Sequence, residues 1–225
     1  MMKEEREEHA NNKLVWDRMK SGDKQSLSKI FTFYYSDLYH YGIKIFNLPD
    51  LVKDSIQDLF LRIWEKRSSL GNVQNPKAYL LSSLRRKLFK NKEMLHVEIS
   101  DELLRKNGDK NFSFSPAEFT EINEISQQLR QSLVLAINKL PERQRELIFL
   151  RFYHNLRYLE IAQIMEVNEQ TVRNMMQRAL TKLRDQMDRH LWEGNENMDD
   201  LMLILLLLFK PQKDRIVFMP SSSGD

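Results

Sequence analysis

Six polar side chains that could read DNA bases fall on one face of a helix predicted at about residues 169–184. They are Gln170, Thr171, Arg173, Asn174, Gln177 and Arg178. Arg donates two parallel hydrogen bonds to guanine, and Asn or Gln pairs in a similar way with adenine, both in the major groove. The opposite face carries Val172, Met176 and Leu180, whose helical spacing predicts burial. This division of the helix indicates base recognition.

A shorter predicted helix precedes this one, and the pair has the spacing of a helix-turn-helix. The segment 155–184 contains a first helix, a turn at 166–168 and the polar-faced second helix. Asn168 is a good N-cap, because its side-chain oxygen can accept a hydrogen bond from the backbone near Thr171. A small residue, Ala162, stands at the helix crossing. The pattern favours insertion into a DNA groove over the alternative, a plain helical hairpin with a solvated face.

The elements that must position these residues are helices. Only 6 Gly and 6 Pro favour long helices with few tight turns. Apolar stripes of helical period cover residues 27–39, 54–66, 76–88 and 129–140. We therefore expect an all-α fold with two small helical domains, at 14–92 and 129–187. An acidic linker, 93–128, joins them, and an apolar C-terminal extension, 188–225, follows.

The formal charge of +3 conceals a strong alternation along the chain. Residues 14–92 hold 15 basic and 7 acidic side chains, and residues 129–187 hold 10 and 6. Between them, residues 93–128 hold 3 basic and 8 acidic side chains. Basic blocks attract phosphate through counterion release, whereas an acidic connector is repelled by it. Two nucleic-acid-binding modules on a tether would have this charge pattern, although solvated helix faces also produce charge runs.

Catalytic and metal chemistry find little support. The absence of Cys excludes a thiolate zinc site and a thiol nucleophile, and it fits a reducing compartment. The five His show no metal-ligand spacing, and no glycine-rich phosphate loop occurs. We therefore expect no enzymatic activity, no metal and no cofactor. The first thirteen residues lack the apolar centre of a secretory signal, which favours a cytoplasmic location.

Two stretches resemble a known family. LPERQRELIFLRFYHNLRYLEIAQIMEVNEQTVRNMMQRALTKLR, at 140–184, resembles region four of bacterial extracytoplasmic-function sigma factors, which binds the promoter's minus-thirty-five element. LVKDSIQDLFLRIWEKR, at 51–67, is similar to the region-two helix that docks on the beta-prime clamp helices of RNA polymerase. NPKAYLLSSLRRKLFK follows at 75–90. Two linked motifs in the right order make the resemblance specific.

The resemblance implies an RNA polymerase sigma factor that directs promoter recognition and transcription initiation. Its partners would be promoter DNA and core RNA polymerase, through the beta-prime clamp helices and the beta flap. An anti-sigma factor is the further partner that the resemblance leaves open. The alternative is a helix-turn-helix regulator that does not act as a sigma subunit, but such a regulator would not need the 51–92 segment. A third alternative is a pure interaction protein whose basic blocks bind an acidic partner.

The resemblance also assigns roles in the first module. The recognition-helix residues given above would read the minus-thirty-five element. A loop and the basic helix after it would hold an unstacked base and the phosphates of the minus-ten element. These residues are Gly71, Asn72, Gln74, Arg85, Arg86, Lys87 and Lys90. The polymerase-docking surface would consist of Asp58, Leu61, Arg62 and Glu65.

Three positions depart from the family pattern. Glu166 occupies the turn position usually filled by Gly, so we expect a left-handed backbone there at some steric cost. Met175 stands where many members carry Arg, and near Arg86 the family often has Asn. The promoter sequence that other members prefer is therefore not transferable to this chain.

The C-terminal extension contains the apolar run LMLILLLLF at 201–209. The run is far shorter than the ~20 residues needed to span a bilayer, so we expect no membrane span. It must nevertheless be covered. We expect the protein's own modules to cover it, ahead of a partner protein, and least of all a membrane surface, because the run has no polar face. Our hypothesis is that this extension is regulatory.

Overall fold

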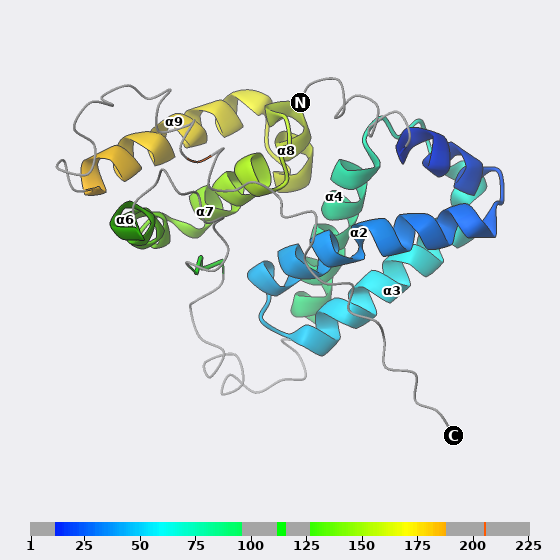
Figure 1. The fold of residues 1–225 in the computed structure, drawn as a ribbon. Coiled ribbons are helices and arrows are strands. Elements are labelled where there is room, and N and C mark those ends of the chain that lie inside the picture. The colour runs from blue at the N-terminus through cyan, green and yellow to red at the C-terminus, as the bar shows by residue number, and fades with distance from the viewer. Residues whose placement is uncertain (1–11, 96–111, 116–126, 188–204, 206–225) are drawn as a thin grey trace.

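The computed structural model describes residues 12–95, 112–115, 127–187 and Leu205. The regular elements in this part of the chain are all helical, with no strand among them (Figure 1). The all-α fold expected from the sequence is therefore confirmed. The helices form two groups that follow one another along the chain (Figure 1).

The first group is built from the residues up to 95. It comprises a helical segment at 12–20, α2 (Lys24–Ile45), α3 (Pro49–Glu65), the 3-10 turn η1 (Arg67–Ser69) and α4 (Pro76–Leu95). Asp23 caps α2, because its carboxylate accepts hydrogen bonds from the Gln25 backbone N–H at 2.9 Å and the Ser26 hydroxyl at 2.6 Å. Both α3 and α4 begin at a proline, which has the backbone angle of a first helical residue. The buried apolar faces of α2, α3 and α4 meet in one core.

The second group carries the predicted helix-turn-helix. It comprises α6 (Gln127–Asn138), α7 (Glu142–Ile148), the π-helical turn η3 (Phe149–Tyr153), α8 (Tyr158–Met165) and α9 (Glu169–Gln186). Ile161 of α8 and Val172 and Leu183 of α9 are fully buried, which fixes the polar face of α9 outward. The π turn shifts the register of α7 and stacks the Phe149 ring on that of Tyr153, with centroids 4.5 Å apart.

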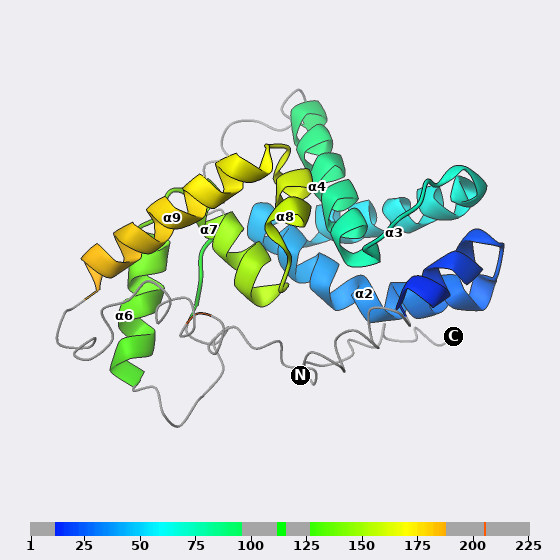
Figure 2. The same ribbon diagram turned by 90° about the horizontal axis from the view of Figure 1, so that it is seen from above.

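The two groups pack against each other and share one apolar cluster. Helix α4 lies beside α8, as the view from above shows (Figure 2). Polar side chains cross this interface, including Asn75, whose amide donates to Glu160 Oε1 at 2.9 Å, and Arg85, which pairs with Glu146 at 2.8 Å. The interface therefore contains charge and hydrogen bonds as well as apolar contact.

A short part of the predicted linker, 112–115, takes part in this packing. The Phe112 N–H donates to the Lys44 carbonyl of α2 at 2.7 Å. The Phe114 N–H donates to Asn138 Oδ1 of α6 at 2.8 Å, and the Asn138 amide donates back to the Phe114 carbonyl at 2.9 Å. Both Phe side chains are buried. This segment thus ties the first group of helices to the second.

Within the C-terminal extension the structure describes only Leu205, which is helical and fully buried within the apolar cluster. The rest of the 201–209 run lies outside the described residues, as does most of the predicted linker. Among the residues that are described, no helix combines the length and the apolar character needed to cross a membrane.

Candidate nucleic-acid interface

The turn between α8 and α9 sets the angle between these two helices. Glu166 has φ 56° and ψ 48°, the left-handed conformation expected from its place in the turn. Asn168 then caps α9, since its Oδ1 accepts the Thr171 N–H at 2.7 Å and the Thr171 hydroxyl at 2.8 Å. The predicted N-cap and the predicted left-handed residue are both confirmed.

The structure places the six predicted base-reading residues together along the outer face of α9. Five are exposed, whereas Thr171 is half-buried by its bonds to the cap. The Gln170 amide donates to Asn174 Oδ1 at 3.0 Å, so these two side chains are held side by side. Such an array can present donors and acceptors to the edges of neighbouring base pairs.

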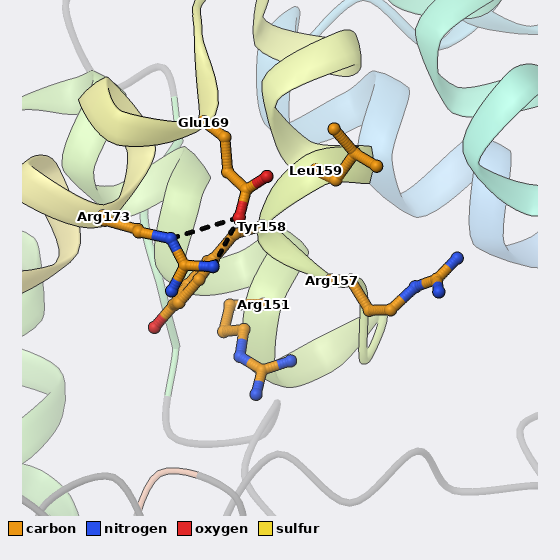
Figure 3. Close-up of a pocket in the computed structure, with 6 residues that line it drawn as sticks. All are labelled: Arg151, Arg157, Tyr158, Leu159, Glu169 and Arg173. Atoms are coloured by element: carbon orange, nitrogen blue, oxygen red, sulfur yellow. Dashed lines mark hydrogen bonds and ion pairs between the residues drawn. The ribbon is translucent and has the colours of Figure 1, made fainter.

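A shallow pocket of about 420 Å³ lies at the start of both helices (Figure 3). Its lining residues are Arg151, Arg157, Tyr158, Leu159, Glu169 and Arg173. Arg173 forms an ion pair with Glu169, one turn earlier on α9, and its guanidinium lies 5.0 Å from the Tyr158 ring centroid. The same ring lies 5.3 Å from the guanidinium of Arg151. Three cationic side chains therefore surround one exposed hollow beside the outer face of α9.

Sequence reasoning missed Arg151, Arg157 and Tyr158 as members of this surface. Arg157 precedes the first residue of α8, where its backbone N–H donates to Glu160 Oε2 at 2.8 Å and its guanidinium donates to Glu160 Oε1 at 2.7 Å. The pair Arg157 and Glu160, three residues apart at a helix start, was the available sequence signal. Arg151 carried no such signal, because only the π turn brings it beside Tyr158.

The predicted minus-ten residues divide into two groups. Gly71, Asn72 and Gln74 are all exposed in the loop between η1 and α4, where Lys20 Nζ donates to the Gly71 carbonyl at 3.0 Å. On α4, Lys90 is exposed and Arg86 keeps 58% of its side-chain surface. The loop and these two cations are accessible to a ligand.

Arg85 and Lys87 are engaged elsewhere. Lys87 Nζ lies 2.9 Å from Asp58 Oδ2 on α3. Arg85 keeps only 11% of its side-chain surface and points toward the second group of helices, where it pairs with Glu146. Burial disfavours the Arg85 charge, but the hydrogen bond and the charge of Glu146 outweigh burial and raise its pKa. Arg85 is therefore a cation that is held by other groups of the protein and has little contact with solvent.

The predicted docking residues lie together on the outer face of α3. Asp58, Leu61, Arg62 and Glu65, with Lys87 of α4, line a hollow of about 250 Å³. Leu61 keeps 62% of its surface exposed, so an apolar side chain stands in the middle of a charged surface. In contrast, the described residues contain no group of three or more His, Asp or Glu placed to hold a metal ion.

Known proteins resemble this chain in both sequence and fold. The profile of the family described as Sigma-70, region 4 matches residues 130–183. The ECF RNA polymerase sigma factor SigM of Bacillus subtilis is 26% identical over 161 residues, which cover 71% of this chain and 93% of SigM.

Two solved structures are also similar. CnrH, in complex with the cytosolic domain of CnrY, matches 76% of this chain and 94% of its own, with a TM-score of 0.50 and 16% identity. RpoE of Bartonella quintana, in complex with the anti-sigma factor NepR, matches 77% and 98%, with a TM-score of 0.49 and 23% identity. At this low sequence identity, the match to CnrH supports the fold alone.

The two sequence matches extend over helices of the structure, and the shorter match covers the helix-turn-helix. The region-four match encloses α7, α8 and most of α9, and therefore the whole helix-turn-helix. The match to SigM is nearly three times as long and so reaches well beyond that region. The chain therefore carries a Sigma-70 region 4 domain at residues 130–183, and it is similar to an extracytoplasmic-function RNA polymerase sigma factor over 71% of its length.

Proposed function

We propose that the chain is an RNA polymerase sigma factor of the extracytoplasmic-function type and that it reads the minus-thirty-five element of its promoters with the outer face of α9. The observation that carries the proposal is the geometry of that helix. Its apolar face is buried, its start is fixed by the Asn168 cap, and its recognition residues form one exposed row. Sigma factors direct core RNA polymerase to promoters, and a major-groove reader needs such a row of donors and acceptors.

The pocket beside α9 supports a second contribution to the same contact. Arg151 and Arg157 lie on the same side as Arg173, around the start of α8 (Figure 3). Cationic side chains at that position would neutralise phosphates next to the bases that α9 reads. Phosphate contacts fix the register of a protein on DNA, whereas base contacts supply sequence preference.

The first group of helices would serve the minus-ten element and the polymerase. The exposed loop residues Gly71, Asn72 and Gln74 can surround a single unstacked base, and Lys90 can meet the phosphates. The α3 surface around Leu61 offers an apolar anchor with charged neighbours, a common composition for a protein interface. We propose that it docks core RNA polymerase in the cytoplasm.

Run-off transcription tests this function directly. Core RNA polymerase, from Bacillus subtilis for example, is supplied with the purified chain and a pool of genomic promoter fragments, and the transcripts are sequenced. We expect defined start sites that require both proteins, and we expect the Leu61→Asp variant to lose them while it retains duplex DNA binding. Duplex binding without initiation would instead favour a regulator that does not act as a sigma subunit.

A further inference from the structure

An acidic side chain stands at the start of the helix that we propose to read DNA. Glu169 is the first residue of α9, and the next acid on that helix, Asp185, comes close to its other end. The Glu169 side chain keeps 35% of its surface exposed and lines the hollow beside the outer face of α9 (Figure 3). DNA is a polyanion, so a carboxylate in this position is repelled by the phosphates unless a donor on the DNA compensates it.

Two side-chain pairs lie next to each other at the start of α9. Arg173 Nε donates to Glu169 Oε1 at 3.1 Å, and Arg173 Nη2 donates to the same oxygen. One residue further along, the Gln170 amide donates to Asn174 Oδ1 at 3.0 Å. From the residues that the structure describes, Glu169 Oε2 receives no hydrogen bond. One carboxylate oxygen therefore remains available to a donor on a ligand.

Glu169 also has a structural role that needs no DNA. An acid in the first turn of a helix is stabilised by the helix dipole, and a pair with Arg one turn later adds a little more. Neither effect distinguishes one DNA sequence from another. A structural role and a role in base recognition can therefore be separated by experiment.

The chemistry of the major groove decides which base suits a carboxylate. Cytosine presents an N4 amino donor there, and Glu accepts from it, whereas guanine presents only the acceptors N7 and O6. A carboxylate placed against acceptors is left unpaired, which costs more than the loss of a neutral contact. An acid on a reading helix therefore favours cytosine and also penalises the wrong base.

We propose that Glu169 determines specificity in the minus-thirty-five contact by accepting a hydrogen bond from the N4 amino group of a cytosine and by repelling other base pairs at that position. The proposal rests on the proposed role of α9 in reading this element. Arg173, which is held beside Glu169, would bind a guanine close to that cytosine. Glu169 thus lowers the affinity for DNA in general and lowers it least for the preferred element.

Selection from a duplex pool randomised over the minus-thirty-five element measures the preference for each base at each position. The full chain is used both alone and bound to core RNA polymerase, and the bound duplexes are sequenced. We expect the unchanged protein to select cytosine at one position. Glu169→Ala should reduce that preference by roughly 5- to 100-fold, as for the loss of one base contact. Its average affinity for the pool should rise, because a negative charge has left the DNA-facing surface.

Two further variants separate the charge from the hydrogen bond. Glu169→Gln removes the charge but keeps a side-chain oxygen, so it should bind the whole pool more tightly and retain part of the preference for cytosine. Asp185→Asn is the matched control, because it removes a carboxylate that is 63% exposed near the other end of the same helix. It should leave every base preference unchanged.

An Arg173→Ala background shows whether Glu169 acts on its own. If Glu169 only positions Arg173, adding Glu169→Ala changes no base preference once the guanidinium is gone. We expect instead that the preference for cytosine falls in this background as well, because Glu169 contacts the base itself.

The proposal is overturned if Glu169→Ala and Glu169→Gln, both folded by circular dichroism, select the same bases as the unchanged protein. It is equally overturned if Glu169→Ala has no effect in the Arg173→Ala background. The absence of defined start sites in run-off transcription would instead count against the proposed function. The selection with the chain alone does not depend on initiation, so the two failures are distinguishable.

Discussion

Among the residues proposed to read the minus-thirty-five element, Arg173 has the best-defined position. Its ion pair with Glu169 and its place over the Tyr158 ring hold the guanidinium at the edge of the α9 face. The ion pair is exposed, and exposed pairs contribute little stability, so Arg173 can exchange Glu169 for a base without a large cost. The Arg173 side chain is therefore held in place by Glu169 and Tyr158 but remains available to contact a base.

We expect Arg173→Ala to weaken binding to the preferred minus-thirty-five duplex by about 1–3 kcal/mol, because one bidentate base contact is lost. Binding to a duplex with that element scrambled should change much less. Fluorescence anisotropy on the two duplexes measures the difference.

Lys90→Ala is the matched comparison, because Lys90 can meet phosphate only. When both duplexes extend through the minus-ten element, whose phosphates Lys90 is proposed to contact, Lys90→Ala should weaken both alike and reduce the dependence of log affinity on log salt by about one. Equal losses on both duplexes for Arg173→Ala would contradict the assignment of α9 as the reading helix.

His154 makes folding stability depend on pH. Burial and the nearby charge of Lys77 lower its pKa to about 3 from an ordinary value of 6.5, and neither ring nitrogen has a hydrogen-bond partner among the residues that the structure describes. Below pH 6.5 the His154 ring becomes protonated in the unfolded chain, whereas in the folded protein it stays neutral until the pH approaches 3. The His154 contribution is therefore complete above pH 6.5 and is lost as the pH falls toward 3.

We expect this residue to lower the free energy of unfolding by up to about 1.4 kcal/mol per pH unit between pH 6.5 and 4.5. His154→Leu should remove that part of the slope, since an apolar side chain leaves no ring nitrogen to protonate. Urea unfolding at several pH values measures it. The lowered pKa of Asp37 acts below about pH 3.8 and does not enter this window. An unchanged slope in His154→Leu would show that His154 is not buried as a neutral ring.

At the scale of the elements, α8, its turn and α9 were predictable because every signal is local. The cap at Asn168 and the left-handed turn at Glu166 depend on neighbours within a few residues. The π turn was not predictable, because it depends on how Phe149 packs against Tyr41 and Phe112 from distant parts of the chain. Local patterns fix helices, whereas tertiary packing fixes their irregularities.

The turn offers a test of backbone strain. Glu166→Gly should raise the free energy of unfolding relative to Glu166→Ala by about 1 kcal/mol, because Gly adopts the left-handed conformation without a clash at Cβ. Both variants remove the contact with Arg86, so their difference isolates the backbone. Thermal or urea unfolding measures it. Equal stabilities would show that the turn relaxes away from φ 56°.

At the scale of the whole molecule, the sequence indicated two basic modules but not how they meet. Arg85 and Glu146 are 61 residues apart, and periodicity shows only that each lies on a polar helix face. The family resemblance implied that Arg85 faces DNA, and the structure shows it facing Glu146. A cation on a helix face can serve either partner, and the sequence cannot distinguish them.

The C-terminal extension gives the last test of how far the molecule closes on itself. Leu205 is fully buried in the shared apolar cluster, which agrees with the expectation that the protein's own modules cover the 201–209 run. Leu205→Ala should then lower the free energy of unfolding by about 2–5 kcal/mol, as for other buried leucines. Leu135→Ala is the control, because Leu135 is 63% exposed and should change stability by less than about 0.5 kcal/mol. If Leu205→Ala behaved like Leu135→Ala, the run would not be part of the folded core, and its regulatory role would require a partner protein instead.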